Sequence, residues 1–496
     1  MREEENSSDW IHHRDYRLPK REINALRDIA FKIEEKPNFT VEDQKTVKLD
    51  LSSTRIWRIS PIKHLEHLRE LDLSHTEVSD LSPLQRLEFL QKLVLWDTEI
   101  GDLSPLQGLK SLTVLDVGDT NVSNIFSLEN LDHLHTLSLA LLRIFNFAPL
   151  QNLKNLTALD LSCTNISDLS LLRDLVQLQQ LDLWGTAISD LSPLQELKNL
   201  RTLNLRRVKA DLTPLAELTT LRDLNLENAK FSDLSWLGSL TRLRRLSLSE
   251  TNVRDLSPLQ ALKSLEVLNL RSTKVSDLSP LKGLTNLKEL VLENTKLPDL
   301  SPLLNLHIQT LKLWKASISD LSPLQELTSL RSLDLEDTDI SDPSSLKNLE
   351  ELQSLDLSRT KVTDLSFLKA LTHLEDLSLR RTDLIDFSPL KHLKNLRELY
   401  LAFTDISDLS PLQGLKNLEI LELQGTAVTD LSPLKHLESL ERLSLKYTNV
   451  SDVSPLMNLE NLQVLGLGGT NVSWNDEVVA SLREKGVTIH FGYDFT

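Results

Sequence analysis

Apolar residues recur along this chain at a fixed spacing, and leucine holds most of these positions. One unit runs from Leu71 to Leu90 and reads Leu-Asp-Leu-Ser-His-Thr-Glu-Val-Ser-Asp-Leu-Ser-Pro-Leu-Gln-Arg-Leu-Glu-Phe-Leu. The spacing is 22 residues, except for two steps of 21 that end at Leu224 and Leu311. Because one such unit cannot bury its apolar face alone, the repeat predicts a solenoid of stacked units. Twenty units open at leucines: Leu49, Leu71, Leu93, Leu115, Leu137, Leu159, Leu181, Leu203, Leu224, Leu246, Leu268, Leu290, Leu311, Leu333, Leu355, Leu377, Leu399, Leu421, Leu443 and Leu465.

Each unit predicts a strand followed by a short helical turn. The segment from Leu71 to Leu73 alternates apolar and polar residues, which predicts a strand with its leucines turned inward. Ser82 and Pro83 suit a helix N-cap and the first helical position, so they predict a 3₁₀ or α turn on the convex side. Three leucines of this segment are expected to face the core: Leu84, Leu87 and Leu90.

The repeat resembles a known family. Its pattern Leu-x-x-Leu-x-Leu-x-x-Thr-x-Val-x-Asp-Leu-x-Pro-Leu-x-x-Leu is similar to leucine-rich repeats, and the Asp-Leu-Ser-Pro-Leu turn resembles the internalin subclass over about 47–496. The resemblance implies an α/β solenoid, a curved horseshoe with a parallel sheet on the concave face and 3₁₀ or α turns on the convex face. It also implies binding of other macromolecules on the concave face, but we expect no named internalin partner.

One column departs from the family pattern, because threonine stands where the family has asparagine, as at Thr76 and Thr186. We expect the threonine hydroxyl to bond the backbone of a neighbouring coil, as the family's asparagine amide does, and so to form a ladder along the solenoid. That bond must be replaced or omitted where threonine is lost, at Leu142, Val208, Ala229 and Ala316.

The two ends differ from the repeat and are expected to close it. We expect a polar tail over 1–18 and an N-terminal helical cap over 19–46, ahead of repeats over 47–470. A solenoid exposes an apolar end at its first coil, which an amphipathic element must cover. The expected helix begins at Pro19 and has one apolar face, formed by Ile23, Leu26, Ala30 and Ile33.

We expect a C-terminal cap over 471–496. The segment Asp476–Lys485 has acidic residues early and basic residues late, and Gly486 follows it, which predicts an α-helix. Val487 then begins an expected last strand at the repeat spacing.

The formal net charge of −17 has a structural explanation. One aspartate column accounts for nearly the whole excess, and its carboxylates are placed to accept backbone N–H groups of the following turn. The charge argues against nucleic-acid binding but identifies no basic ligand. The column holds Asp80, Asp102, Asp168, Asp190, Asp211, Asp233, Asp255, Asp277, Asp299, Asp320, Asp342, Asp364, Asp386, Asp408, Asp430 and Asp452.

Cysteine content and terminal segments bear on the compartment of the protein. Cys163 is the single cysteine, so no intramolecular disulfide is possible. No secretory signal follows Met1 and no membrane-spanning stretch occurs, so we expect a cytoplasmic protein, or else one delivered outside the cell without a standard signal peptide.

Three features could carry chemistry. His64 and His67 could chelate a metal, the Cys163 thiol could react, and stacked aspartates could hold a cation or act as acid and base. We prefer a surface histidine pair, a half-buried thiol and a hydrated strand face, and expect no enzyme, no cofactor and no metal site. The stacked pairs are Asp50 with Asp72, Asp160 with Asp182, and Asp334 with Asp356.

Aromatic residues in concave-facing positions are the candidate partner-binding sites. Three tryptophans share the slot three residues after an opening leucine, and aromatics off a sheet face are typical interface anchors. The alternative is that they pack on neighbouring strand residues. The predicted partner-binding residues are Trp96, Trp184, Trp314, Tyr400, Phe403, Tyr447, Arg380 and Arg381, whereas Trp57, Trp236 and Trp474 lie in edge, convex or cap positions where packing is expected.

These observations favour a monomeric, non-enzymatic protein-binding module that is either a scaffold or a bacterial effector. It would bind a protein partner, with no nucleic acid and no membrane. The alternative is a regulatory subunit of an enzyme, which would resemble the protein phosphatase regulator built from similar repeats.

Overall fold

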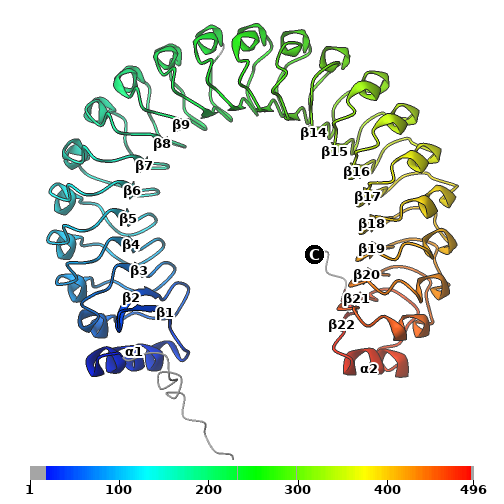
Figure 1. Ribbon diagram of the computed structural model, residues 1–496, viewed down its shortest axis with the longest axis horizontal. Coiled ribbons are helices and arrows are strands. Elements are labelled where there is room, and N and C mark those ends of the chain that lie inside the picture. Colours follow the sequence, from blue (N-terminus) through cyan, green and yellow to red (C-terminus); the bar gives the residue numbers. More distant parts are fainter. Residues whose placement is uncertain (1–17, 232, 298, 493–496) are drawn as a thin grey trace, which may run out of the picture. The chain divides into compact units, whose positions relative to one another are not determined.

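The computed structural model describes residues 18–231, 233–297 and 299–492. It divides into two compact units, with the division between Leu243 and Arg244, and each is described by itself. In both units short strands line the inner side and 3₁₀ turns lie on the outer side (Figure 1). The predicted solenoid is therefore confirmed within each unit. The predicted tail over 1–18 lies, apart from Leu18, outside the described residues.

The first unit begins with helix α1 (Lys20–Ile33) and an antiparallel hairpin, after which the pairing is parallel. Opening leucines meet in register, as Leu71 does with Leu93. The strands are β1 (Asn38–Glu42), β2 (Lys45–Asp50), β3 (Glu70–Asp72), β4 (Lys92–Val94), β5 (Val114–Asp116), β6 (Thr136–Ser138), β7 (Ala158–Asp160), β8 (Gln180–Asp182), β9 (Thr202–Asn204) and β10 (Asp223–Asn225).

The second unit continues the same parallel pairing and ends with helix α2 (Glu477–Glu484) and strand β22. The strands are β11 (Arg245–Ser247), β12 (Val267–Asn269), β13 (Glu289–Val291), β14 (Thr310–Lys312), β15 (Ser332–Asp334), β16 (Ser354–Asp356), β17 (Asp376–Ser378), β18 (Glu398–Tyr400), β19 (Ile420–Glu422), β20 (Arg442–Ser444), β21 (Val464–Gly466) and β22 (Thr488–His490).

The outer turns are 3₁₀ helices of three or five residues. In the first unit they are η2 (Ser60–His64), η3 (Ser82–Leu84), η4 (Ser104–Leu106), η5 (Phe126–Leu128), η6 (Ala148–Asn152), η7 (Ser170–Leu172), η8 (Ser192–Glu196), η9 (Thr213–Glu217) and η10 (Ser235–Ser239). In the second unit they are η11 (Ser257–Ala261), η12 (Ser279–Leu281), η13 (Ser301–Leu303), η14 (Ser322–Glu326), η15 (Ser344–Asn348), η16 (Ser366–Ala370), η17 (Ser388–His392), η18 (Ser410–Leu412), η19 (Ser432–Leu434) and η20 (Ser454–Asn458).

The core is a stack of leucines that passes from coil to coil. In one coil Leu71, Leu73, Leu84, Leu87 and Leu90 are all at most 1% exposed. Burying a leucine contributes about 1.5–3 kcal/mol, so several per coil make stacking the dominant stabilising term. The side chains left for function are those that this core does not use.

The start of each 3₁₀ turn differs by one residue from the sequence prediction. Leu81 holds the N-cap position of η3, so Ser82 is the first helical residue and Pro83 follows it. The cause is Asp80, which accepts the Ser82 N–H at 2.8 Å and the Ser82 hydroxyl at 2.9 Å. All sixteen aspartates of this column accept the same backbone N–H, so the predicted capping role is confirmed.

The expected threonine ladder between coils is wrong. The Thr186 hydroxyl donates to the Leu183 carbonyl of its own coil at 2.6 Å. The left-handed residue between them, Gly185, turns the chain so that the hydroxyl returns to the preceding strand. The same bond occurs at Thr54, Thr76, Thr98, Thr120, Thr164, Thr251, Thr273, Thr295, Thr338, Thr360, Thr382, Thr404, Thr426, Thr448 and Thr470.

The buried face of α1 is rotated from the predicted one. Leu26 is buried as predicted, together with Ala25 and Ile29, whereas the other predicted residues are only half-buried: Ile23, Ala30 and Ile33. The rotation follows from a hydrogen bond in which buried Glu22 accepts the Thr46 N–H of β2 at 2.8 Å. The hairpin strand β1 was not predicted from the sequence.

At the other end, Asp476 accepts the N–H groups of Val478 and Val479 and caps α2. Strand β22 exists, but its predicted register is wrong, because Ile489 rather than Val487 pairs with Leu465. The α-helix takes more residues than the 3₁₀ turn that it replaces, which shifts the strand by two positions.

Candidate interaction surface

Two columns of each coil lie on the inner side without entering the core. The first lies between the strand leucines, and the second follows the end of the strand by two or three residues. Backbone bonds between coils continue through the second column, since the His75 N–H donates to the Trp96 carbonyl at 2.8 Å. Within the described residues these columns place side chains of adjacent coils one strand spacing apart, about 4.8 Å.

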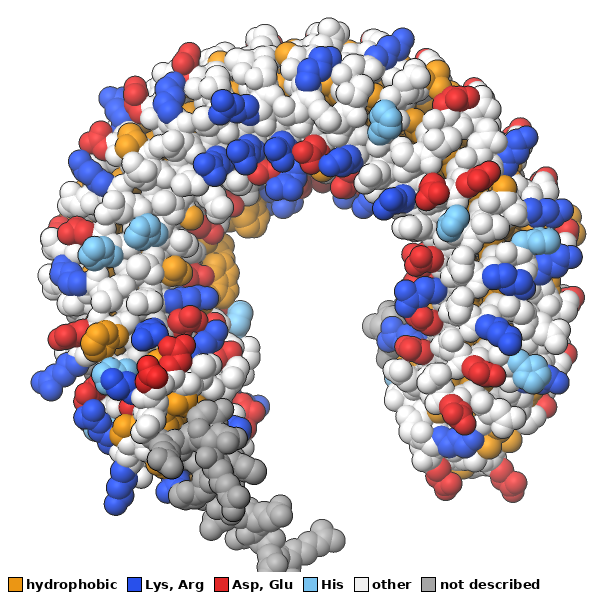
Figure 2. Space-filling model, in the orientation of Figure 1, with side chains coloured by type: hydrophobic (Ala, Val, Ile, Leu, Met, Phe, Trp, Pro, Cys, Tyr) orange, Lys and Arg blue, Asp and Glu red, His pale blue; other side chains and the backbone are white. Residues whose placement is uncertain are grey.

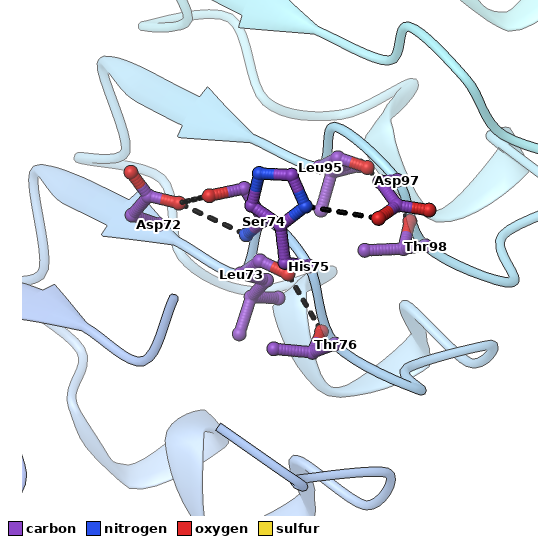
Figure 3. Close-up of polar contacts among 8 residues, drawn as sticks. All are labelled: Asp72, Leu73, Ser74, His75, Thr76, Leu95, Asp97 and Thr98. Atoms are coloured by element: carbon purple, nitrogen blue, oxygen red, sulfur yellow. Dashed lines mark hydrogen bonds and ion pairs between the residues drawn. The ribbon is translucent and has the colours of Figure 1, made fainter. Parts of the chain in front are cut away.

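Figure 3 shows one coil of this surface. Asp72 accepts the Ser74 N–H at 2.9 Å and the Ser74 hydroxyl at 2.6 Å. The Thr76 hydroxyl donates to the Leu73 carbonyl at 2.6 Å. His75 reaches across to Asp97 of the next coil, with 2.9 Å between Nδ1 and a carboxylate oxygen. Both side chains of that pair are more than half exposed, so the pair adds little to stability.

The stacked aspartates are in register, as the sequence predicts, and each accepts a backbone N–H of its own coil. Asp182 accepts the Trp184 N–H at 2.9 Å, and Asp334 accepts the Glu336 N–H at 2.9 Å. Burial raises the pKa of Asp182. Burial, opposed by that hydrogen bond and aided by the charge of Asp356, raises the pKa of Asp334 to about 6. These aspartates therefore stabilise the turn that follows the strand, by accepting the backbone N–H two residues later.

The three tryptophans are half-buried on the inner side. Arg206 lies 5.5 Å from the Trp184 ring centroid, and Lys315 lies 4.5 Å from the ring of Trp314. The Trp184 indole N–H is buried and meets no hydrogen-bond acceptor among the residues that the structure describes. Trp96 packs along the surface against the next coil. The rings therefore pack on neighbours and still present a face outward.

Tyr400, in β18, belongs to a charged cluster of the second unit. The Arg380 guanidinium lies 4.3 Å from its ring centroid and pairs with Glu422 at 2.7 Å. The Tyr400 hydroxyl donates to Glu398, and burial together with that bond raises its pKa. The structure thus brings Arg380 and Tyr400 together, whereas Arg381 lies 4.4 Å from the ring centroid of Phe403.

Phe403 and Tyr447 are the most exposed of the candidate aromatics, at 40% and 38%. Charged side chains of both signs lie along the inner side of each unit (Figure 2). The glycines on which the rings lie, Gly425 and Gly469, were missed by sequence reasoning. Their sequence signal was available, because each stands 22 residues after its aromatic residue.

The tryptophans outside the inner face divide into two groups. Trp236 is buried and donates to the Asp233 carbonyl at 3.1 Å, as packing requires. Trp57 and Trp474 are 55% and 56% exposed, which the sequence did not predict, and they stack on Arg58 and Arg483. Stacking on an adjacent guanidinium leaves one face of each ring in solvent.

The other candidate groups are the histidines and the single cysteine. His67 stacks on Phe89 with ring centroids 5.5 Å apart, and Cys163 is half-buried with its thiol pKa raised by burial. Across residues 18–231, 233–297 and 299–492, no three His, Cys, Asp or Glu side chains converge in a metal-binding arrangement. Nor does any helix in this part of the chain have the length and apolarity to cross a bilayer.

Sequence comparison identifies the repeat. A family model described as leucine rich repeats (2 copies) matches residues 154–196, 176–217, 263–305 and 394–436. No curated protein matches the chain. Among solved structures, internalin C2 from Listeria monocytogenes is 30% identical over 47% of this chain and 82% of its own, with a TM-score of 0.31.

Two solved structures are similar in fold. One is the mouse RP105/MD-1 complex, at 22% identity with a TM-score of 0.66, covering 88% of this chain and 84% of that one. The other is the ectodomain of the Arabidopsis thaliana receptor kinase GASSHO1/SCHENGEN3 with CASPARIAN STRIP INTEGRITY FACTOR 2, at 21% identity with a TM-score of 0.62, covering 95% of this chain and 71% of that one. At these identities the likeness concerns the fold alone.

Proposed function

Because this chain belongs to the leucine-rich repeat family and carries internalin-like repeats, we propose that it is a non-enzymatic protein-binding module. Its partner is a protein that lies on the inner face of the sheet. Two relatives in fold were solved as complexes with protein or peptide partners, which supports this class of function. The fold is typical of modules that bind extended partners along a concave surface.

The observation that carries the proposal is the pairing of half-exposed inner-face aromatics with cations. Trp184 with Arg206, Trp314 with Lys315, and Tyr400 with Arg380 each offer an apolar face beside a charge. Aromatic and arginine side chains dominate binding energy at protein interfaces, while charge sets register and association rate.

The charged residues beside the inner-face aromatics differ between the first unit and the second. In the first unit Trp96 and Trp184 stand among aspartates that include Asp72, Asp116 and Asp160. In the second unit Lys315, Arg380 and Arg381 lie over the rings of the candidate aromatics Trp314, Tyr400 and Phe403. Lys315 and Arg380 are also paired with Asp337 and Glu422. We infer that a basic segment binds the first surface and an acidic segment binds the second, because like charges facing each other would oppose binding.

The test is affinity capture with the full chain as bait, followed by mass spectrometry. Trp184→Ser and Trp314→Ser probe the inner face of each unit separately, and Trp57→Ser, an exposed aromatic in an edge position, is the matched control. The proposal expects captured proteins to be lost with an inner-face variant and kept with the control. Retention with both inner-face variants and loss with Trp57→Ser would overturn it.

A captured catalytic subunit would identify the chain as a regulatory subunit of an enzyme. This is a narrower form of the same function, because the partner is still a protein.

A further inference from the structure

One side of the first unit carries a phenylalanine that the repeat does not require. Residues six, eight and nine after an opening leucine lie between the strand and the outer turn of a coil. Serine is the commonest residue at the middle position, but Phe145 holds it in the coil of Leu137. The Phe145 side chain is 88% exposed, and Phe126 in the preceding coil is 50% exposed. We call these two residues the side patch. Trp57 holds the same position as Phe145 but has Arg58 4.1 Å from its ring centroid, whereas within the described residues no ring or cation contact covers Phe145.

The backbone of Phe145 is held in place although its side chain is exposed. Its N–H donates at 3.0 Å to the carbonyl of Ser123, which stands three residues before Phe126 in the preceding coil. In the following coil, the Asn165 amide accepts the Ile144 N–H at 2.9 Å and donates to the Ile144 carbonyl at 3.1 Å. These bonds join the coil to both of its neighbours. A partner that contacts the ring therefore needs to order little further backbone, which favours affinity.

The aspartate column that caps the outer turns is interrupted at the side patch. Asn124 and Asn146 replace aspartate in the two coils that hold Phe126 and Phe145. Their amide oxygens accept the N–H groups of Phe126 and Ala148 at 2.9 Å, so the capping bond is kept. Two negative charges are nevertheless removed. Because covering a carboxylate is costly and covering a hydrogen-bonded amide is less so, this exchange suits a surface on which a partner lies.

Exposed carboxylates stand on one flank of the side patch. They occupy the same side of the solenoid in the two coils that precede Phe126, and across the part of the chain that the structure describes they form no ion pair. We call them the acidic flank: Glu77, Asp80, Glu99 and Asp102. Arg143 is a cation on the coil of Phe145 itself. Cations of a partner are therefore expected over the acidic flank rather than over the side patch.

We propose that Phe145 enters an apolar pocket of a folded protein partner, whose lysine or arginine side chains lie over the acidic flank. A side chain that projects into solvent from an ordered backbone fits a concave receptor. Apolar anchors in pockets supply most of the affinity at protein interfaces, while opposite charges set orientation and association rate. This surface lies between the strands and the outer turns, so it is a second interaction surface beyond the inner face of the proposed function.

A second copy of this chain is the alternative occupant, and charge disfavours it. A symmetric dimer uses the same patch on both subunits. In a parallel pairing the acidic flank would face itself. In an antiparallel pairing it would face the aspartates that follow Phe145 along the same side, such as Asp190 and Asp211. Both pairings bring like charges together, so the observations favour a different, basic partner.

The test uses the full chain with Phe145 replaced by the photo-cross-linker p-benzoyl-L-phenylalanine. A second full chain carries the cross-linker in place of Ile385, which holds the same position in a coil of the second unit and is 91% exposed. Both proteins are irradiated in a lysate of the cells that produce the chain, and mass spectrometry identifies the products. A protein that cross-links from residue 145 and not from residue 385 is then purified, and biolayer interferometry measures its binding to the variants.

The proposal expects this purified protein to bind Phe145→Ser at least tenfold more weakly than wild type, and Ile385→Ser as well as wild type. Both side chains are almost fully exposed, so neither change should alter the melting curve. Glu77→Lys combined with Glu99→Lys changes two carboxylates that do not cap a turn. This double variant should slow association and weaken its dependence on salt. Trp184→Ser should bind like wild type, because it belongs to the inner face.

Three results would overturn the proposal: no product specific to residue 145, equal binding by wild type and Phe145→Ser, or an unchanged salt dependence in the double lysine variant. A specific product that is a dimer of this chain would also overturn it, in favour of a second copy. Loss of the purified partner with Trp184→Ser but not with Phe145→Ser would refute the side patch and leave the proposed inner-face function standing.

Discussion

The indole of Trp96 lies against Gly118 of the next coil, so closely that a Cβ at residue 118 would stand 2.4 Å from Trp96 Cζ3. No real Cβ contact is that short, so the ring occupies the space that any other residue would fill. The same relationship joins Phe403 with Gly425 and Tyr447 with Gly469. These three inner-face aromatics therefore each lie against a glycine that stands one repeat later in the sequence.

We predict that Gly118→Ala displaces the Trp96 ring toward solvent. The alanine methyl group meets the outer edge of a movable side chain, so the ring rotates and the stability cost stays on the order of 1 kcal/mol. Acrylamide quenching of tryptophan fluorescence should rise. The increase should vanish when Trp96→Phe is added, and an increase that persists in that double variant would contradict the displacement.

The threonine column predicts a local stability effect. Thr186→Val keeps the side-chain shape and removes the hydroxyl that donates to buried Leu183. The Thr186 N–H still reaches that carbonyl at 3.3 Å, so the loss should be about 1 kcal/mol rather than the full cost of an unsatisfied group. Urea denaturation measures it. Thr186→Ser keeps the hydroxyl and should lose less, and an order reversed between the two variants would argue against the bond.

Asp334 predicts a pH dependence. Its pKa of about 6 lies above the value near 4 of an unfolded aspartate, so the folded chain binds the proton more tightly between these pH values. Stability contributed by this group is therefore present below pH 4 and is lost as pH rises through 6. Asn stands in the same column at Asn269 and accepts the equivalent backbone N–H.

Asp334→Asn should consequently raise the free energy of unfolding more at pH 7.5 than at pH 4.5. The difference should be on the order of 1 kcal/mol after discounting for partial exposure. Denaturant titrations at the two pH values measure it. The same effect of the substitution at both pH values would show that the carboxyl is not perturbed.

Once a captured partner is available, Trp184→Ser should weaken its complex by about 2 kcal/mol or more if the ring is a hot spot, with an unchanged melting curve. Surface plasmon resonance separates the rate constants. The loss should appear mainly as faster dissociation, because a buried anchor acts after encounter. A change confined to association would indicate that the ring is not an anchor.

Arg381→Glu should act differently, by slowing association with an acidic partner and reversing the sign of its salt dependence. An exposed cation attracts an acidic segment before contact, and salt screens that attraction over about 10 Å at 0.1 M. Association rates at several salt concentrations test this. Equal rates for wild type and variant at low salt would remove Arg381 from the encounter surface.

Local features were predictable because they depend on residues within one repeat. The leucine column predicts strands in register, and Leu71 does meet Leu93. Aspartate two residues before Ser82 predicts a carboxylate bonded to that backbone N–H, and it is found there. Asp72 and Ser74 have the same spacing, so their bond could also have been predicted.

The sequence by itself determined the repeat, its strand and turn positions, the buried columns and the inner-face columns, since each needs only a period and a local hydrogen bond. The tertiary structure alone decided which neighbour each exposed group meets. The left-handed turn sent the Thr186 hydroxyl back to Leu183, and α2 moved Ile489 into the place expected for Val487. The sequence shows that a glycine stands 22 residues after Phe403 and after Tyr447, but only the structure shows that each ring turns toward its glycine, because side-chain direction depends on the space that the next coil leaves.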